Sequence, residues 1–143
     1  MRVWSDDFVE GKPLPNQCAY RAGNISPHLG WNGVPPGTQS FALICSDPDA
    51  PRGDWIHWLV HDISSDVREI CSGAPPPGIE VKNDFGEQKW GGPAPPSGTH
   101  RYFFTLYALD VSSLKKVTKK SFLKICEEHM IESAQIMGTF TKG

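Results

Sequence analysis

The sequence of 143 residues has no apolar run long enough to cross a bilayer, and residues 1–7 show no charged segment leading into an apolar one. We therefore expect no membrane-spanning segment, no signal peptide and a cytoplasmic location. Neither charge is in excess, since 14 lysines and arginines stand against 16 aspartates and glutamates, for a net charge of −2. Because the chain has no basic footprint, nucleic acid is not an expected partner.

The motifs of several enzyme and metal-binding classes are also missing. No GxSxG marks a nucleophilic serine, and no HxH or HExxH spacing marks a metal site. The cysteines Cys18, Cys45, Cys71 and Cys126 are widely spaced without a CxxC, which favours free thiols in a reducing compartment over disulfides. Cys126 and His129 have helical i,i+3 spacing, but a lone pair of this kind favours core packing over metal binding. We expect no catalytic nucleophile, no metal and no cofactor.

The chain is rich in turn residues that separate strongly apolar segments. It has 14 glycines and 13 prolines, and this pattern is typical of a turn-rich β protein rather than a disordered one. The apolar, aromatic and β-branched segments predict three long strands and three short ones. The long strands are 40–46, 56–63 and 101–109, and the short ones lie near 3–8, 67–70 and 79–82.

One helix is predicted late in the chain, from Ser121 as N-cap to Met137, with Gly138 as the residue that ends it. Its apolar residues recur at helical spacing, so one face is expected to pack on the sheet. A shorter helix is expected near Leu114. The length predicts one domain over residues 1–143. Long strands with a single late helix predict a mainly β fold in which a helix covers a β-sandwich.

Polar side chains stand at the ends of strands that are otherwise apolar. Asp47 and Asp49 follow the first long strand, His57 begins the second, and His100 and Tyr102 begin the third. Alternation along a strand places residues i and i+2 on one face, so each Asp47–Asp49 and His100–Tyr102 pair is expected to share a face. The same rule places His57 in phase with His61. We predict that these strand ends meet, with the loop 91–96 as a rim.

Such a site suits a small anion, because imidazolium and phenol groups donate hydrogen bonds and glycine-rich backbone adds N–H donors. The aspartate pair is then placed for an attached cation such as an amine, and Trp55, Trp58, Trp90 and Phe85 for an aromatic or amphiphilic remainder. Simpler roles stand beside these: structural capping for Asp49, core packing for Trp58 and Trp90, and a surface or strand-pair position for His61. Arg101 points away from its neighbours in the strand, which favours a structural salt bridge.

Seven segments together resemble the phosphatidylethanolamine-binding protein family, which includes the Raf kinase inhibitor proteins and the plant flowering regulators. The similarity is to its short bacterial and archaeal branch, and it covers nearly the whole chain in the family's order. The segments are Asn24–Trp31, Ser46–Pro51, Trp55–Trp58, Asn83–Gly86, Gly91–Pro96, Gly98–Tyr102 and Gly138–Phe140.

The resemblance implies a Greek-key antiparallel β-sandwich, a C-terminal helix and a small anion-binding cavity. It places seven residues on the family's pocket positions: Asp47, Asp49, His57, Pro95, Pro96, His100 and Tyr102. It also implies a cis peptide bond between Ala50 and Pro51, and it allows a homodimer.

The leading interpretation is a non-catalytic binding protein that takes a phosphorylated or otherwise anionic small molecule and regulates a partner such as a kinase. Two alternatives stay open. One is a hydrolase of small phosphoesters or esters that uses a pocket histidine as general base. The other is a protein-interaction module of the kinase-inhibitor type.

Overall fold

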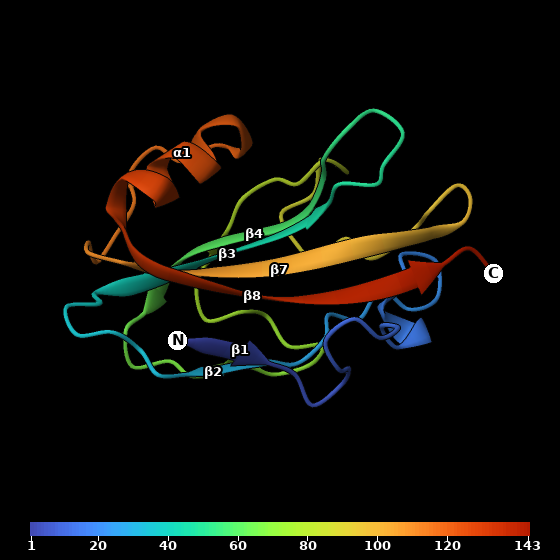
Figure 1. Cartoon of the computed structure of the whole chain (residues 1–143). Helices are drawn as coiled ribbons and strands as arrows, with labels where there is room; N and C mark the ends of the chain where they lie inside the picture. Colours follow the sequence, from blue (N-terminus) through green and yellow to red (C-terminus); the bar gives the residue numbers. More distant parts are fainter.

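The computed structural model describes all residues from Met1 to Gly143, and its strands form two antiparallel sheets that face each other (Figure 1). The smaller sheet has the order β1-β2-β5 and the larger one β6-β4-β3-β7-β8. The small sheet consists of β1 (Arg2–Trp4), β2 (Leu29–Asn32) and β5 (Glu69–Ile70). The large sheet consists of β3 (Ser40–Asp47), β4 (Trp55–Ser64), β6 (Ile79–Glu80), β7 (Thr99–Leu109) and β8 (Met130–Thr141). The mainly β sandwich with a late helix is thus confirmed.

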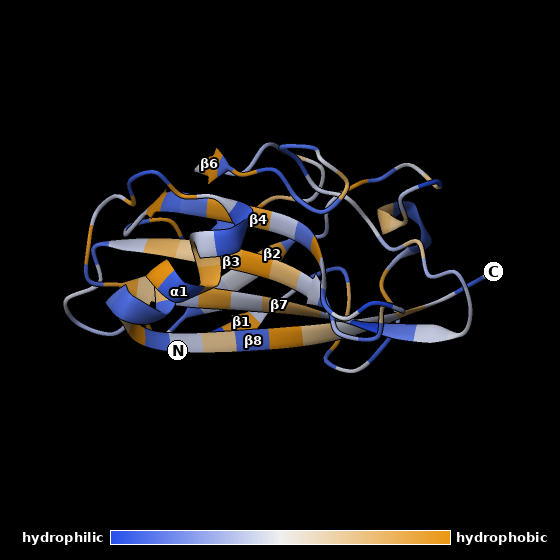
Figure 2. Cartoon of the chain, turned by 90° about the horizontal axis from the view of Figure 1, so that it is seen from above, coloured by the Kyte–Doolittle hydropathy of each residue, from blue (hydrophilic) through white to orange (hydrophobic).

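Two apolar clusters hold these layers together. The larger contains 19 buried residues and fills the space between the sheets, with Phe41, Trp58 and Phe104 among them. The smaller packs the other face of the large sheet against helix α1 (Lys119–His129) through residues such as Leu59 and Phe122. Because β3 is covered on both faces, its residues 41–45 are all apolar, whereas β8 at the edge of the sheet mixes apolar and polar residues (Figure 2).

The observed helix begins two residues before the predicted start, Ser121, and ends eight residues before the predicted end, Met137. Thr118 is the N-cap, and its side chain and that of Ser121 form a capping box. The helix ends at His129, and the next twelve residues form β8, which pairs with β7 along its whole length. The prediction of helix over Met130–Met137 is therefore wrong, because the long ladder to β7 outweighs the local helical pattern. The shorter helix near Leu114 does not form, although Leu114 is buried.

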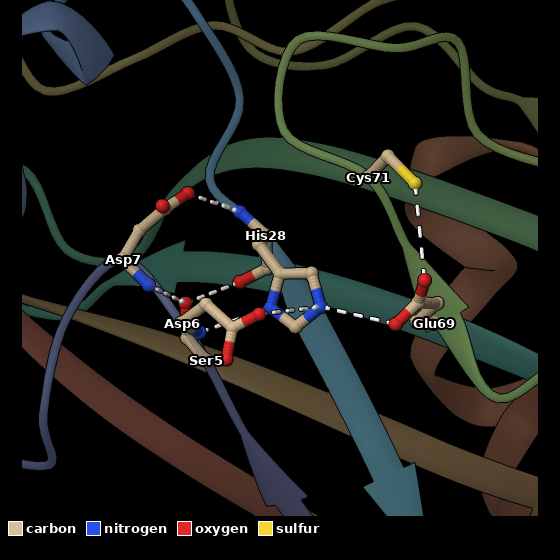
Figure 3. A network of polar contacts seen from close by, with 6 residues as sticks. All are labelled: Ser5, Asp6, Asp7, His28, Glu69 and Cys71. Carbon is tan, nitrogen blue, oxygen red and sulfur yellow. Dashed lines mark hydrogen bonds and ion pairs between the residues drawn. The ribbon is translucent and has the colours of Figure 1, made fainter.

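A polar network around His28 fastens the N-terminal segment to the small sheet (Figure 3). The backbone N–H of Asp6 donates to His28 Nδ1 at 3.0 Å, which leaves the proton on Nε2, 3.4 Å from a Glu69 carboxylate oxygen. The carboxylate of Asp7 accepts from the His28 backbone N–H at 2.7 Å. The network thus joins the end of β1 to β2 and β5.

Candidate functional site

A β-bulge in β4 turns His57 towards the space between the sheets. Cys45 of β3 pairs with Trp58, and the next residue, Ser46, pairs with Ile56, so His57 is the extra residue. A bulge of this kind re-aims a side chain. The His57 ring therefore lies 5.1 Å from that of Tyr102, in an edge-on contact.

A second irregularity follows in β4, between the pairs Phe41–Ile63 and Leu43–Val60. His61, between these pairs, contacts the Phe122 ring of α1 on the opposite face of the large sheet. The prediction that His57 and His61 lie in phase is therefore wrong, because the bulge at His57 breaks the two-residue period. His61 is also buried, rather than a surface residue.

A cavity of about 270 Å³ lies where the ends of β3, β4 and β7 meet. It includes six of the seven residues expected from the sequence, and Asp49 is the exception. The lining residues are Asp47, Ala50, Pro51, Trp55, His57, Phe85, Ala94, Pro95, Pro96, His100 and Tyr102. We call this cavity the histidine pocket. The ends of β3, β4 and β7 thus lie together, as the sequence predicted, and the loop 91–96 contributes Ala94, Pro95 and Pro96 to the wall.

Hydrogen bonds fix both pocket imidazoles by their Nδ1 atoms. His100 Nδ1 donates to the buried carboxylate of Asp47 at 2.6 Å. His57 Nδ1 donates to the Gly91 carbonyl at 2.6 Å. In the neutral rings the Nε2 atoms are then hydrogen-bond acceptors, and neither has a partner within the chain. They become donors only when a ring takes up a second proton.

Burial controls the protonation of His57 and Tyr102. Desolvation lowers the pKa of His57, although the Gly91 carbonyl and the charge of Asp47 act in the opposite direction. Desolvation raises the pKa of Tyr102, and the charge of Asp47 adds to this effect. At neutral pH His57 is therefore uncharged and Tyr102 keeps its proton.

The Tyr102 hydroxyl is fully buried and has no hydrogen-bond partner. A buried hydroxyl without a partner costs free energy, so native proteins rarely keep one. Here the hydroxyl belongs to a residue that lines a cavity beside two open imidazole nitrogens. The hydroxyl has a proton to donate, and a molecule that enters the pocket far enough to contact it would give it a partner.

The two aspartates have separate roles. Asp47 holds His100, whereas both carboxylate oxygens of Asp49 accept from the Arg101 guanidinium at 2.9 Å. The Arg101 side chain lowers the pKa of Asp49 through these hydrogen bonds. Arg101 therefore forms the structural salt bridge expected from the sequence. The pair does not present a free carboxylate pair to a cation, because each member already has a cationic or N–H partner.

The rim of the pocket depends on the segment before β2, which the sequence did not indicate as a support. Asn24 accepts from the Gly92 N–H at 2.7 Å and donates to the Trp90 carbonyl at 2.9 Å. The Trp90 indole N–H donates to the Cys18 carbonyl at 3.2 Å. A Cβ atom on Gly92 would lie 1.8 Å from that carbonyl oxygen, so only glycine fits.

The aromatic wall of the pocket is formed by Phe85 and Trp55, whose rings meet edge to face at 5.5 Å. Asn83 positions this wall, since its amide donates to the His57 carbonyl at 3.0 Å and its Oδ1 accepts from the Phe85 N–H. The sequence indicated only a turn at Asn83. Trp58 belongs to the core between the sheets, as its packing role required.

The peptide bond between Ala50 and Pro51 is trans, as is every other peptide bond in the chain. The expected cis bond is therefore wrong. The turn closes instead through a hydrogen bond from the Gly53 N–H to the Ala50 carbonyl, with Gly53 in the left-handed region at φ +101°. Trans is the intrinsically favoured isomer of an X-Pro bond, and this turn forms with that isomer.

Three further features bear on the sequence expectations. All four cysteines are free, and Cys126 is a buried residue of α1 that packs in the cluster between the helix and the large sheet. No three His, Cys, Asp or Glu side chains are grouped so that they could hold a metal ion. None of the helices is both long and apolar enough to span a membrane.

Comparison with known proteins identifies a family, related sequences and related structures. The family model for phosphatidylethanolamine-binding protein matches residues 4–141. A UPF0098 protein of Chlamydia pneumoniae is 39% identical over 99% of both chains, and one of the archaeon Methanothermobacter thermautotrophicus is 40% identical over the full length of both. A crystal structure of a phosphatidylethanolamine-binding protein homologue from Chlamydia trachomatis is 36% identical, covers 99% of this chain and 97% of its own, and superimposes with a TM-score of 0.93.

Proposed function

Because the chain belongs to the phosphatidylethanolamine-binding protein family, in its bacterial and archaeal branch, we propose that the histidine pocket binds a small molecule through a phosphate-type anionic group. The proposed contacts are Tyr102, His57 and His100 for the anionic group, with Asp47 holding His100 in place. The protein acts in this proposal as a non-catalytic binding protein.

The observation that supports this proposal most is the Tyr102 hydroxyl, which is buried without a partner in the wall of the cavity. A phosphate oxygen is a strong acceptor for a phenol O–H, and such charge-assisted hydrogen bonds are stronger than neutral ones. A ligand of this kind would remove the cost of the unpaired hydroxyl. In the unliganded protein the Tyr102 hydroxyl therefore has no hydrogen-bond partner, and an acceptor atom of the ligand would supply one.

The two histidines add a condition on protonation. At neutral pH the open Nε2 of His57 accepts rather than donates, so a bare dianion gains a hydrogen bond there only with an added proton. The proton comes either from solvent or with a singly protonated phosphate group, whose second pKa is about 6. Anion binding is thus expected to take up protons and to strengthen as the pH falls.

The remainder of the ligand is expected to lie against Trp55, Phe85 and Pro95, which form the apolar side of the pocket. Trp55 is 37% exposed, so this side opens to solvent and leaves room for a group larger than phosphate. An aromatic face also accepts a cationic group such as an amine. We therefore expect phosphoethanolamine to bind at least as tightly as inorganic phosphate.

The test is an NMR titration of the histidine ring signals with sulfate, phosphate, phosphoethanolamine and acetate. Sulfate keeps its charge across the range where histidine titrates, so it separates protonation of the protein from protonation of the ligand. We expect saturable shifts of His57 and His100 that weaken from pH 6 to pH 8 and vanish in His100→Ala. His129→Ala is the matched control, because His129 is a half-exposed histidine outside the pocket that bonds Asp110 at the end of α1.

Absence of any saturable shift at His57 and His100 with all four anions would refute the proposal. Equal loss of binding in His129→Ala would also refute it, because that result would assign the effect to general charge rather than to the pocket.

One observation favours an enzyme as the second candidate. A histidine held by a buried carboxylate, as His100 is by Asp47, is the arrangement of a general base. The pocket walls contain no serine, threonine or cysteine, so the nucleophile would be water. Turnover of a phosphoester or small ester that is lost in His100→Ala, with the fold retained, would favour this candidate over binding alone.

A further inference from the structure

His61 and Asp62 form a second histidine–carboxylate pair, on the opposite face of the large sheet from the histidine pocket. His61 Nδ1 lies 2.7 Å from an Asp62 carboxylate oxygen, and the His61 side chain is only 7% exposed. A pair with the same Nδ1 geometry, His100 and Asp47, lines the pocket described above. None of the seven family segments includes His61 or Asp62.

The carboxylate of Asp62 is fixed and ionised. It accepts from the Ser113 hydroxyl at 2.6 Å and from the Leu114 N–H at 2.9 Å. Burial acts to raise the pKa of Asp62, but these hydrogen bonds and His61 outweigh it, and the net effect is a lowered pKa. His61 Nδ1 therefore holds its proton towards Asp62, and Nε2 is the atom left for another partner.

Structural capping explains Asp62 but not His61. Asp62 lies in the left-handed region at φ +56°, where the contacts to Ser113 and Leu114 hold it. Those contacts tie the chain before α1 to β4 whether or not His61 is present. The Nε2 atom of His61 has no hydrogen bond within the chain and is not fully enclosed.

A cleft of about 540 Å³ opens beside His61, between the start of α1 and the edge strand β6. We call it the helix cleft. It is lined by His61, Ile79, Glu80, Val81, Lys82, Asn83, Gly86, Gln88, Val117, Thr118 and Lys119.

The charged groups at the helix cleft come from every element around it. Lys82 and Lys119 are exposed cations in its lining, and the N-terminus of α1 adds its partial positive charge. Of the carboxylates, Asp62 is bonded to His61, Glu80 accepts from the Trp58 indole N–H at 2.8 Å, and Asp84 bonds Lys119. Each of these carboxylates thus has a hydrogen-bond partner, although Glu80 keeps its negative charge because the indole is neutral, and Lys82 has no partner within the chain.

We propose that the helix cleft is a second anion site, which takes a small phosphorylated or sulfated molecule. The anionic group lies at the start of α1, between Lys82 and His61 Nε2, which donates to the anion once the ring has taken up a second proton. Its chemistry resembles that of the histidine pocket, but its position on the other face of the sheet makes the two sites separate. This proposal does not depend on the proposed function of the histidine pocket.

The experiment follows the His61 ring signals by NMR while sulfate is added to the whole protein. We expect a saturable shift at His61 that persists in His100→Ala, the variant that removes the response of the histidine pocket. In Lys82→Gln the half-saturating sulfate concentration for His61 should rise about three- to fivefold, the effect of losing one solvent-exposed charge contact.

Lys124→Gln is the matched control, because it removes the same charge from an exposed position on α1 away from the helix cleft. Its half-saturating concentration at His61 should equal that of the wild type. Equal effects of Lys82→Gln and Lys124→Gln would overturn the proposal, because general ionic screening would then explain the shift of the His61 signal. A His61 signal that does not move with sulfate would overturn it as well.

Discussion

Replacement of Tyr102 by phenylalanine should stabilise the unliganded protein and weaken anion binding at the same time. The substitution removes only the hydroxyl, which is fully buried and has no partner. An unsatisfied buried polar group costs about 1–3 kcal/mol. Since the surrounding packing is kept, we expect Tyr102→Phe to raise the free energy of unfolding by about 1 kcal/mol, or the melting temperature by about 3 °C.

The same substitution removes the one proposed donor that needs no added proton. A hydrogen bond to a charged group contributes about 1.5–3 kcal/mol, which corresponds to about a 10- to 100-fold loss of affinity for phosphate or sulfate. The assays are urea unfolding of the unliganded protein and anion titration of the folded protein. We expect the free energy of unfolding to rise and the anion affinity to fall.

Tyr107→Phe is the control, since Tyr107 lies on the same strand but packs in the cluster under α1. Its hydroxyl is not one of the enclosed atoms that lack a partner. We expect little change in stability and none in anion affinity. A clear loss of stability in Tyr102→Phe would refute the reasoning, because it would mean that the hydroxyl is already satisfied in the free protein.

Three further predictions concern the support and the charges of the pocket. Gly92→Ala should lower the free energy of unfolding by about 3 kcal/mol or more, because the new Cβ would meet a backbone carbonyl. As a control, the Cβ of Gly86→Ala would meet no atom, and this substitution should lower the free energy of unfolding by only about 1 kcal/mol, because Gly86 has a left-handed φ of +78°. Burial lowers the pKa of His57 in the folded protein, so between pH 6.5 and that lower pKa the unfolded state binds more protons than the folded state. The free energy of unfolding should therefore be highest above pH 6.5 and should fall as the pH is lowered through this window. Urea unfolding across this range checks the sign, and His57→Gln should remove that part of the slope. In anion titrations Asp47→Asn should bind the anion at least tenfold more weakly, because His100 loses its buried carboxylate partner. Asp49→Asn should keep its anion affinity within twofold of the wild type, because Asp49 bonds Arg101 instead. A larger loss of affinity in Asp49→Asn than in Asp47→Asn would contradict the assigned roles.

The sequence predicted the three strands that form the pocket to within two residues at each end, but it did not predict the phase of His57 within its strand. Asp47, His57, His100 and Tyr102 could be grouped because antiparallel strands bring polar residues at their ends to one edge. The phase of His57 could not be found, since a bulge depends on how β3 and β4 pair and leaves no local signal.

The error over β8 has a similar cause. Residues 130–137 carry apolar residues at helical spacing, but pairing with β7 decides their conformation. Such tertiary contacts override local propensity and cannot be read within a short window. The supporting role of Asn24 was missed for the same reason, because its partners Trp90 and Gly92 lie more than sixty residues away.

The support of the rim by Asn24 has a consequence for the order of folding. The bonds from Asn24 to Gly92 and from Trp90 to Cys18 close loops of 68 and 72 residues, whereas β4 joins β3 through a short turn. Closing long loops costs more chain entropy, so contacts of this kind form late. The rim is therefore expected to assemble after the β3–β4 hairpin, at the same stage as the β3–β7 pairing, which closes loops of similar length. Because the bonds of Asn24 lie outside the ladder of the large sheet, the rim can open locally while that sheet stays paired. Hydrogen exchange at the Gly92 amide would report that partial opening without global unfolding.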